Sequence, residues 1–137
     1  MNSIQKIFEM KDRKVILSTL WIFAMLNYLY ADVFGLFFNP TAQQETMRMT
    51  EGLALGFAVL METAIAMVLL SRVLKYRANR WANIIAGIIH TVAVFLTLFA
   101  GTPALYYIFF ATIEIACTLF IICYAWKWPN EEMQNNL

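Results

Sequence analysis

The sequence predicts an all-α integral membrane protein, built as an up-and-down bundle of four transmembrane helices. Of its 137 residues, 61% are hydrophobic, and the mean hydropathy is +0.63. An ordinary soluble domain is only roughly 45–50% apolar. Four stretches approach the roughly 20 apolar residues that cross a bilayer, at about residues 15–38, 52–70, 81–100 and 103–126. Because the connections are short, we expect a single transmembrane domain over residues 1–137, with the lipid bilayer as its surroundings.

The first stretch follows a basic segment and resembles a signal peptide in that respect. Its apolar run continues through YLYADVFGLFF, beyond the roughly 7–15 residues of a signal core. Asn39 and Pro40 then end the run, since both residues favour turns. We therefore expect the first stretch to be a transmembrane helix.

The remaining helices follow one another closely. Glu51 and Gly52 open the second, and the basic segment SRVLKYRANR joins it to the third. The turn AGTPA joins the third to the fourth, with Gly101 ending one helix and Pro103 at the first position of the next, where each residue type is favoured. Consecutive helices should therefore be antiparallel neighbours.

The basic residues indicate the orientation. They cluster before the first helix, between the second and third, and after the fourth, whereas Arg48 alone lies on the other side. The positive-inside rule therefore places both short termini in the cytoplasm. Beside membrane spans such residues indicate anionic-lipid contact rather than nucleic-acid binding. All four tryptophans fall towards the same ends, as interfacial anchors do: Trp21, Trp81, Trp126 and Trp128.

The two cysteines argue against thiol chemistry. Cys117 and Cys123 are six residues apart on the fourth helix, which separates them by about 9 Å along its axis. That separation is too large for a disulfide, and the spacing is not that of a redox motif.

Three ionisable side chains lie near the middle of predicted helices. Glu62 is ten residues from the outer end of the second, His90 nine from the inner end of the third, and Glu114 eleven from the outer end of the fourth. Helix rise therefore places all three at about mid-membrane. Inserting an ionised group there costs from about 2.5 to more than 10 kcal/mol, so each needs a partner or a function.

Helical spacing turns these side chains towards a common interior. On the third helix one small or polar stripe follows steps of four and three: Asn79, Asn83, Gly87, His90, Val94, Thr97 and Gly101. Because lipid offers polar groups no partner, such stripes should face the bundle interior. On the first helix Asn27 and Tyr28 reach a similar depth, and Asp32 lies about one turn nearer the outside. The predicted pocket therefore contains Glu62, His90 and Glu114 and is bordered by Tyr28, Asn27 and Asp32.

This pocket has the composition of a proton switch. Two carboxyl groups in a site of low dielectric constant do not both ionise easily, and an imidazole beside them shares the proton. A small molecule or cation that displaces a proton would give a proton-coupled transporter, the leading hypothesis. Tyrosine and phenylalanine side chains would add cation–π attraction.

Two alternatives remain open. A membrane-embedded enzyme would use Glu62 or Glu114 with His90 in acid–base chemistry on a lipid-like or quinone-like substrate. An assembly subunit without chemistry would use the polar residues only to hold its helices together. No metal or other cofactor is expected, because His90 lacks the acidic neighbour of a Glu-x-x-His motif and is the only histidine.

Three segments carry a resemblance that covers nearly the whole chain: LSTLWIFAMLNYLYADV, SRVLKYRANRWANIIAGIIHT and TPALYYIFFATIEIACTLFIICYAWKW. They resemble a bacterial family of short four-span membrane proteins with a domain of unknown function, which implies an inner-membrane location. In size and span number the chain is also similar to the small multidrug resistance transporters. Their essential glutamate lies in the first span, where this chain has Asp32 and Asn27. A transporter this small is expected to form a homodimer, for which Gly52 and Gly56 offer a GxxxG-type face.

Overall fold

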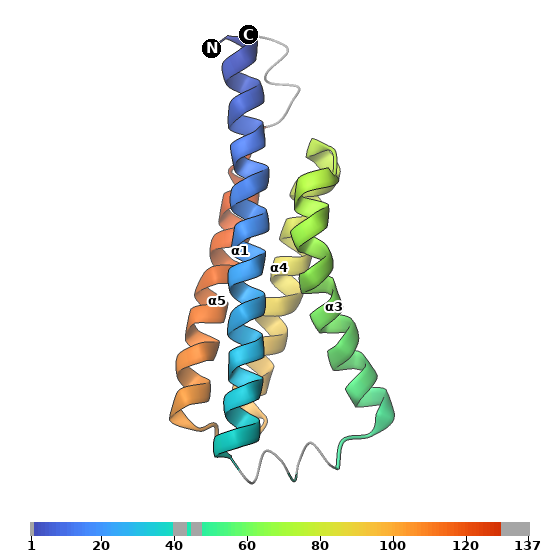
Figure 1. Cartoon of the computed structure of the whole chain (residues 1–137), viewed down its shortest axis with the longest axis vertical. Coiled ribbons are helices and arrows are strands. Elements are labelled where there is room, and N and C mark those ends of the chain that lie inside the picture. The colour runs from blue at the N-terminus through green and yellow to red at the C-terminus, as the bar shows by residue number, and fades with distance from the viewer. Residues whose placement is uncertain (1, 40–43, 45–47, 130–137) are drawn as a thin grey trace.

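The computed structural model describes residues 2–39, 44 and 48–129, and in this part the long elements are four helices with no strand (Figure 1). Each helix is long and apolar enough to cross a membrane. The all-α, four-helix prediction is therefore confirmed, and the chain has the character of a multi-pass membrane protein. The helices are α1 (Ser3–Phe38), α3 (Glu51–Val73), α4 (Tyr76–Phe99) and α5 (Leu105–Trp126).

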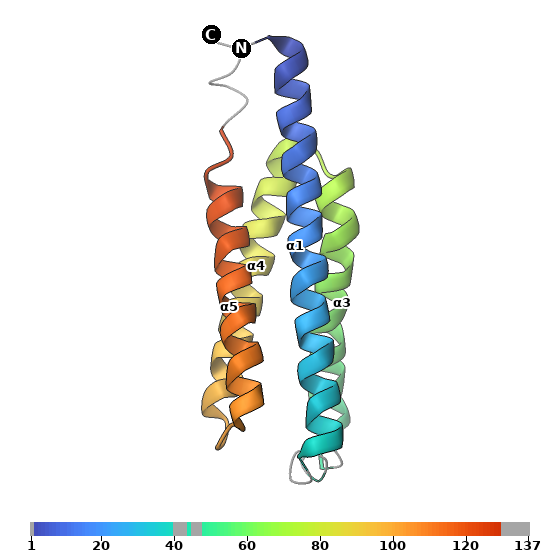
Figure 2. The same ribbon diagram turned by 60° about the vertical axis from the view of Figure 1, so that its left-hand side comes forward.

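The helices form a closed ring in which consecutive elements run in opposite directions. α1 packs against both α3 and α5, α4 packs extensively against α5, and α3 touches α4 more sparsely. Figures 1 and 2 show the same arrangement from two sides. We call the end where α1 begins and α5 finishes the terminal end, and the opposite end, with the α4–α5 turn, the distal end.

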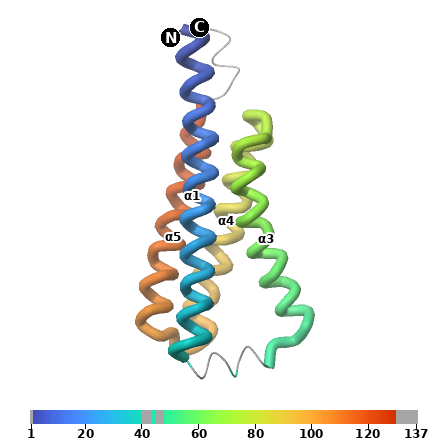
Figure 3. The backbone as a smooth tube through the Cα atoms, in the orientation of Figure 1, coloured from blue at the N-terminus to red at the C-terminus, as the bar shows by residue number. Residues whose placement is uncertain are grey.

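α1 is the longest helix and starts well before its apolar part. Its 36 residues span about 54 Å at 1.5 Å per residue, and it extends past the other helices at the terminal end (Figure 3). The sequence prediction began this helix near residue 15, but no glycine or proline interrupts the polar segment before it. At its start, the backbone N–H of Asn2 donates to Oε1 of Gln5.

Two helix starts at the distal end show how local chemistry sets the boundaries. Thr50 caps α3, since its hydroxyl oxygen accepts from the backbone N–H of Leu53 at 3.3 Å. α5 begins at Leu105, so the prediction that Pro103 is its first residue is wrong. Ala104 is still extended, with ψ 153°, and its carbonyl accepts the helical hydrogen bond from Ile108. Pro40, predicted to end α1, lies outside the described residues.

Packing is tight between α4 and α5 and loose around the first half of α3. A Cβ atom at Gly87 would lie 2.7 Å from Cγ1 of Ile122, so glycine is what allows α4 to approach α5 closely there. By contrast, a Cβ at Gly52 or Gly56 would meet nothing within 4 Å. Neither glycine of the GxxxG pair therefore serves a close helix–helix approach within the described chain. This half of α3 diverges from its neighbours (Figures 1 and 3), which opens the bundle at the distal end.

Candidate functional site

A cavity of about 740 Å³ occupies the distal half of the bundle, where α3 diverges from the other helices. This volume is within the range of pockets that hold small organic ligands, roughly 300–1,000 Å³. All four helices contribute to its wall. The polar and aromatic side chains that line it are Tyr28, Asp32, Asn39, Phe57, Thr97, Thr102, Tyr106, Tyr107 and Glu114.

Glu114 provides a buried carboxyl group in the wall of this cavity. It lies near the middle of α5 and is only 4% exposed. In the part of the chain that the structure describes, its Oε1 atom is buried and has no hydrogen-bond partner. Leaving a buried acceptor unpaired costs about 1–3 kcal/mol, and more if it is charged. The carboxyl group is therefore able to accept a proton, a donor or a cation from the cavity.

Asp32 lines the same cavity from α1. Its side chain is exposed, so the two carboxyl groups in the wall differ: that of Glu114 is buried and that of Asp32 is open. Close by, the hydroxyl of Tyr107 donates to Oγ1 of Thr97 at 2.6 Å. The cavity thus combines two acids with a fixed hydroxyl pair.

His90 lies behind the cavity wall and is linked to it through Tyr28. The imidazole is fully buried; its Nδ1 atom lies 3.0 Å from the hydroxyl of Tyr28, and its Nε2 atom 2.9 Å from Oγ1 of Thr63. Because the Thr63 hydroxyl donates to the carbonyl of Leu60 at 2.6 Å, it accepts from Nε2–H. The neutral ring therefore accepts the Tyr28 proton at Nδ1.

This hydrogen-bond chain links the protonation state of His90 to the orientation of the Tyr28 hydroxyl. If His90 takes up a proton, Nδ1 becomes a donor to Tyr28, whose own hydroxyl hydrogen must then turn elsewhere. Tyr28 lines the cavity together with Asp32 and Glu114. Protonation of the buried imidazole is thereby linked to the hydrogen bond that Tyr28 offers to the cavity.

A second polar cluster closes the bundle on the terminal side of His90. Oδ1 of Asn83 accepts from Nε1 of Trp21 at 2.8 Å and from the hydroxyl of Ser71 at 3.2 Å, and Nδ2 of Asn83 donates to Asn79. All four side chains are fully buried. Trp21 also packs edge-on against His90, with ring centroids 5.3 Å apart. Its predicted role as an interfacial anchor is therefore wrong, whereas Trp81 and Trp126 are exposed.

Two residues of the predicted pocket lie elsewhere. Glu62 is exposed and does not line the cavity, because a step of one residue turns an α-helix by about 100° and the adjacent Thr63 is the one that meets His90. Asn27 bonds back to its own helix, donating to the carbonyl of Phe23 at 2.8 Å. The expectation that Glu62 meets His90 and Glu114 is thus not fulfilled.

The structure also contributes a residue that sequence reasoning missed. Thr63 fixes the orientation of the His90 ring. A threonine is common in an apolar helix, so the sequence favours the neighbouring charged residue, Glu62, as the partner of His90. The position of Thr63 around the axis of α3 could have identified it. His90 needs a partner near the inward face of this helix, where Ala64 and Met67 are buried. Among the described residues, no three His, Cys, Asp or Glu side chains gather as a metal centre requires.

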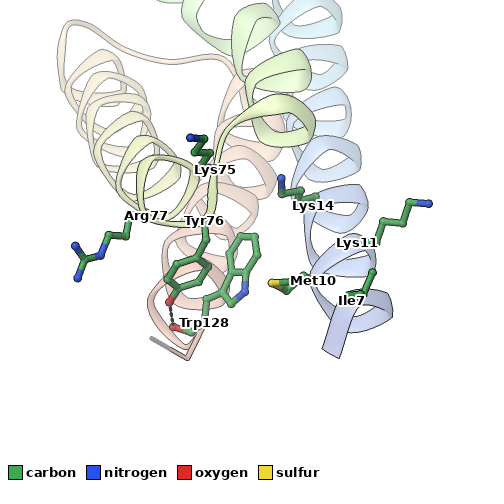
Figure 4. A pocket seen from close by; sticks show the side chains of 8 residues that line it. All are labelled: Ile7, Met10, Lys11, Lys14, Lys75, Tyr76, Arg77 and Trp128. Atoms are coloured by element: carbon green, nitrogen blue, oxygen red, sulfur yellow. Dashed lines mark hydrogen bonds between the residues drawn. The ribbon is translucent and has the colours of Figure 1, made fainter. Parts of the chain in front are cut away.

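A second cavity, of about 530 Å³, lies at the terminal end (Figure 4). Ile7, Met10, Tyr76 and Trp128 line it, with the Tyr76 hydroxyl donating to the Trp128 carbonyl at 2.9 Å. Its lining also includes Lys11, Lys14, Lys75 and Arg77, and Figure 4 shows the ends of Arg77 and Lys11 pointing away. The described lining is thus apolar and cationic with no acidic residue, unlike that of the distal cavity.

The comparisons with known proteins give one family. A family model described as a family of unknown function, DUF6326, matches residues 5–135. No curated protein and no solved structure gives a match to the chain. The general similarity to small multidrug resistance transporters is not confirmed.

Proposed function

Since the chain belongs to DUF6326, a family of unknown function, we propose from its own geometry that it binds a small organic cation in the distal cavity and exchanges it for a proton. In this proposal it is a proton-coupled transporter of the bacterial inner membrane. The single observation that carries the proposal is the unpaired, buried carboxyl oxygen of Glu114 in the wall of a cavity that all four helices line.

Electrostatics favours a positively charged ligand. Asp32 and Glu114 are the acidic residues of the cavity, and no Lys, Arg or His is among its described lining residues. An ionised carboxylate in such a place is stabilised by a cation or neutralised by a proton. The cation and the proton therefore compete for the same carboxyl group, and this competition is what an exchange of one for the other requires.

The aromatic part of the wall supports the same ligand class. Tyr28, Tyr106, Tyr107 and Phe57 line the cavity, and a cation over an aromatic ring gains about 0.5–2 kcal/mol. A hydrophobic cation would thus find both charge and ring faces. A neutral molecule of the same shape would gain only the apolar part.

In this proposal the structure would be one state of an alternating-access cycle, and two features support that assignment. The cavity lies at the distal end, and the cluster of Trp21, Asn83 and Ser71 fills the interior on the terminal side. The basic residues other than Arg48 lie around the terminal end; the Nζ atom of Lys14, for example, donates to the carbonyl of Leu74 at 2.7 Å. With the positive-inside rule, both termini are cytoplasmic and the cavity opens to the outer side.

Binding and proton release in the same sample test this proposal. Purified protein in weakly buffered detergent solution is titrated with tetraethylammonium and tetrapropylammonium, while calorimetry records binding and an indicator dye records pH. We expect binding of the larger ion with proton release, and loss of both in Glu114→Gln. Glu62→Gln is the matched control, since its carboxyl group lies outside the cavity.

Two results would contradict the proposal. One is wild-type protein that neither binds these ions nor releases protons; the other is a Glu114→Gln variant that binds them as the wild type does. A lipid-like molecule that copurifies and is converted chemically would instead support the membrane-embedded enzyme.

A further inference from the structure

The outward face of α3 carries a regular seam that no helix of the chain covers. Seven residues follow alternating steps of three and four, and all are exposed except half-buried Ala66. The face of α3 that packs into the bundle, with Ala64, Met67 and Ser71, is on the other side of the helix. We name this face the α3 seam; it consists of Gly52, Leu55, Val59, Glu62, Ala66, Leu69 and Val73.

This spacing is the pattern by which two helices pack along their whole length. Positions repeating at three and four residues are the a and d positions of a heptad, which form the contact line of a helix pair. Leu55, Leu69 and Val73 are 65%, 67% and 78% exposed, so the ends of the seam are open for contact. The small residues Gly52 and Ala66 allow two backbones to approach.

Glu62 lies at the centre of the seam, where lipid alone gives it no partner. It is eleven residues from each end of α3, about 16 Å along the axis. In the part of the chain that the structure describes, its carboxyl group makes no hydrogen bond or ion pair. Ionisable groups at this depth almost always face protein or a water-filled cavity, and Glu62 does not line the distal cavity.

We propose that the α3 seam is the interface with a second copy of this chain, in a parallel two-fold dimer that brings the two Glu62 carboxyl groups together. A protonated carboxyl group is both donor and acceptor, so two of them satisfy each other. A two-fold axis brings each seam position to its own equivalent, and copies with the same membrane orientation have parallel α3 helices. A second copy of this chain therefore supplies a matching polar group at the depth of Glu62, and no other protein is required.

The dimer goes beyond the proposed function and does not depend on it. No residue of the seam is among the described residues that line the distal cavity, and Thr63 lies on another face of α3, although Ala58, one turn before Glu62, does line it. Dimerisation through the seam therefore takes no seam residue out of the cavity wall. Loss of the dimer and loss of cation binding are separate measurements, and either can fail alone.

Cross-linking in liposomes tests the interface. Both native cysteines are replaced by alanine, and single cysteines are introduced as Val59→Cys or Leu69→Cys within the seam. Leu53→Cys is the control, because it is 52% exposed on the same helix but points away from the seam. With a membrane-permeant oxidant we expect disulfide-linked dimers from the two seam variants and none from the control. Equal cross-linking of all three, or none in the seam, would overturn the proposal.

Subunit counting on the otherwise unmodified protein keeps the test independent of the cysteine variants. Single-molecule photobleaching in dilute liposomes is expected to show two copies per complex. Glu62→Gln retains a donor and an acceptor and should dimerise as the wild type does. Glu62→Leu should raise the dissociation constant about 3- to 18-fold, the range for interhelical hydrogen bonds in membranes. A wild type that stays monomeric, or a Glu62→Leu variant as tightly dimeric as the wild type, would refute the paired carboxyl groups.

Discussion

Glu114→Met is expected to stabilise the protein while it removes cation binding. The carboxyl group is 4% exposed and one of its oxygens has no partner. Methionine has a similar length, so it fills the same space without a polar atom. Removing one unsatisfied buried group recovers about 1–3 kcal/mol, and the free energy of unfolding should rise by that amount.

The matched control is Thr118→Val, one turn further along α5. The Thr118 hydroxyl is fully buried but satisfied: it lies 3.0 Å from the Glu114 carbonyl and 2.8 Å from Oγ1 of Thr91. Valine has the same shape and leaves Thr91 without this partner. We expect the free energy of unfolding to fall by about 1 kcal/mol, the opposite sign to Glu114→Met.

Unfolding by sodium dodecyl sulfate in mixed micelles, followed by tryptophan fluorescence, measures both variants without added ligand. The four tryptophans of the chain supply the signal. If Glu114→Met unfolds at lower detergent than the wild type, the carboxyl group must make a stabilising contact, and the account of Glu114 as an unpaired binding group is refuted.

Three further substitutions test other parts of the structure by the same assay. Gly87→Ala should lower the free energy of unfolding by about 1–3 kcal/mol, because its Cβ would lie 2.7 Å from Cγ1 of Ile122. Adding Ile122→Ala to this variant should recover part of the loss. If the losses of the two substitutions simply add, the clash is contradicted. Tyr28→Phe removes the hydroxyl 3.0 Å from Nδ1 of His90 and should cost about 1 kcal/mol; an unchanged imidazole signal in NMR spectra would contradict the contact. Trp21→Phe removes a buried N–H donor and should cost about 1–3 kcal/mol, and a variant as stable as the wild type would refute its role in closing the terminal side.

The fold was predictable because the length and composition of an apolar stretch are enough to indicate a membrane-spanning helix. Each predicted stretch corresponds to one helix, and the largest difference is the start of α1 at Ser3. Apolar content marks the part of a helix within the bilayer, whereas a helix extends for as long as its backbone bonds and residue types permit. Between Ser3 and Lys14 apolar residues alternate with charged ones and no helix breaker occurs, so the segment is helical although its mean hydropathy is low.

The sequence predicted how deep the candidate site residues lie along their helices, but not in every case whether their side chains point into the bundle. His90 and Glu114 lie on strongly patterned helices, and both are buried as their stripes indicate. α3 is apolar on nearly all sides, so its sequence offers little contrast between the face that packs inward and the face that meets lipid. The charge of Glu62 is then the only feature that predicts an inward direction for it, whereas in the structure the neighbouring Thr63 points inward.

The uneven attachment of α3 gives the helix the geometry of a lever. Near the terminal end it is tied to α1, where Ser18 donates to the Val68 carbonyl at 2.8 Å and Arg72 donates to Ser18 at 3.2 Å. Thr63 is still held by His90, so the free arm runs from Thr63 back to Glu51 and is about 18 Å long. A tilt of about 10° around Thr63 displaces the free end by about 3 Å. Small angular changes at the attached end are thus amplified into large changes of width at the distal mouth.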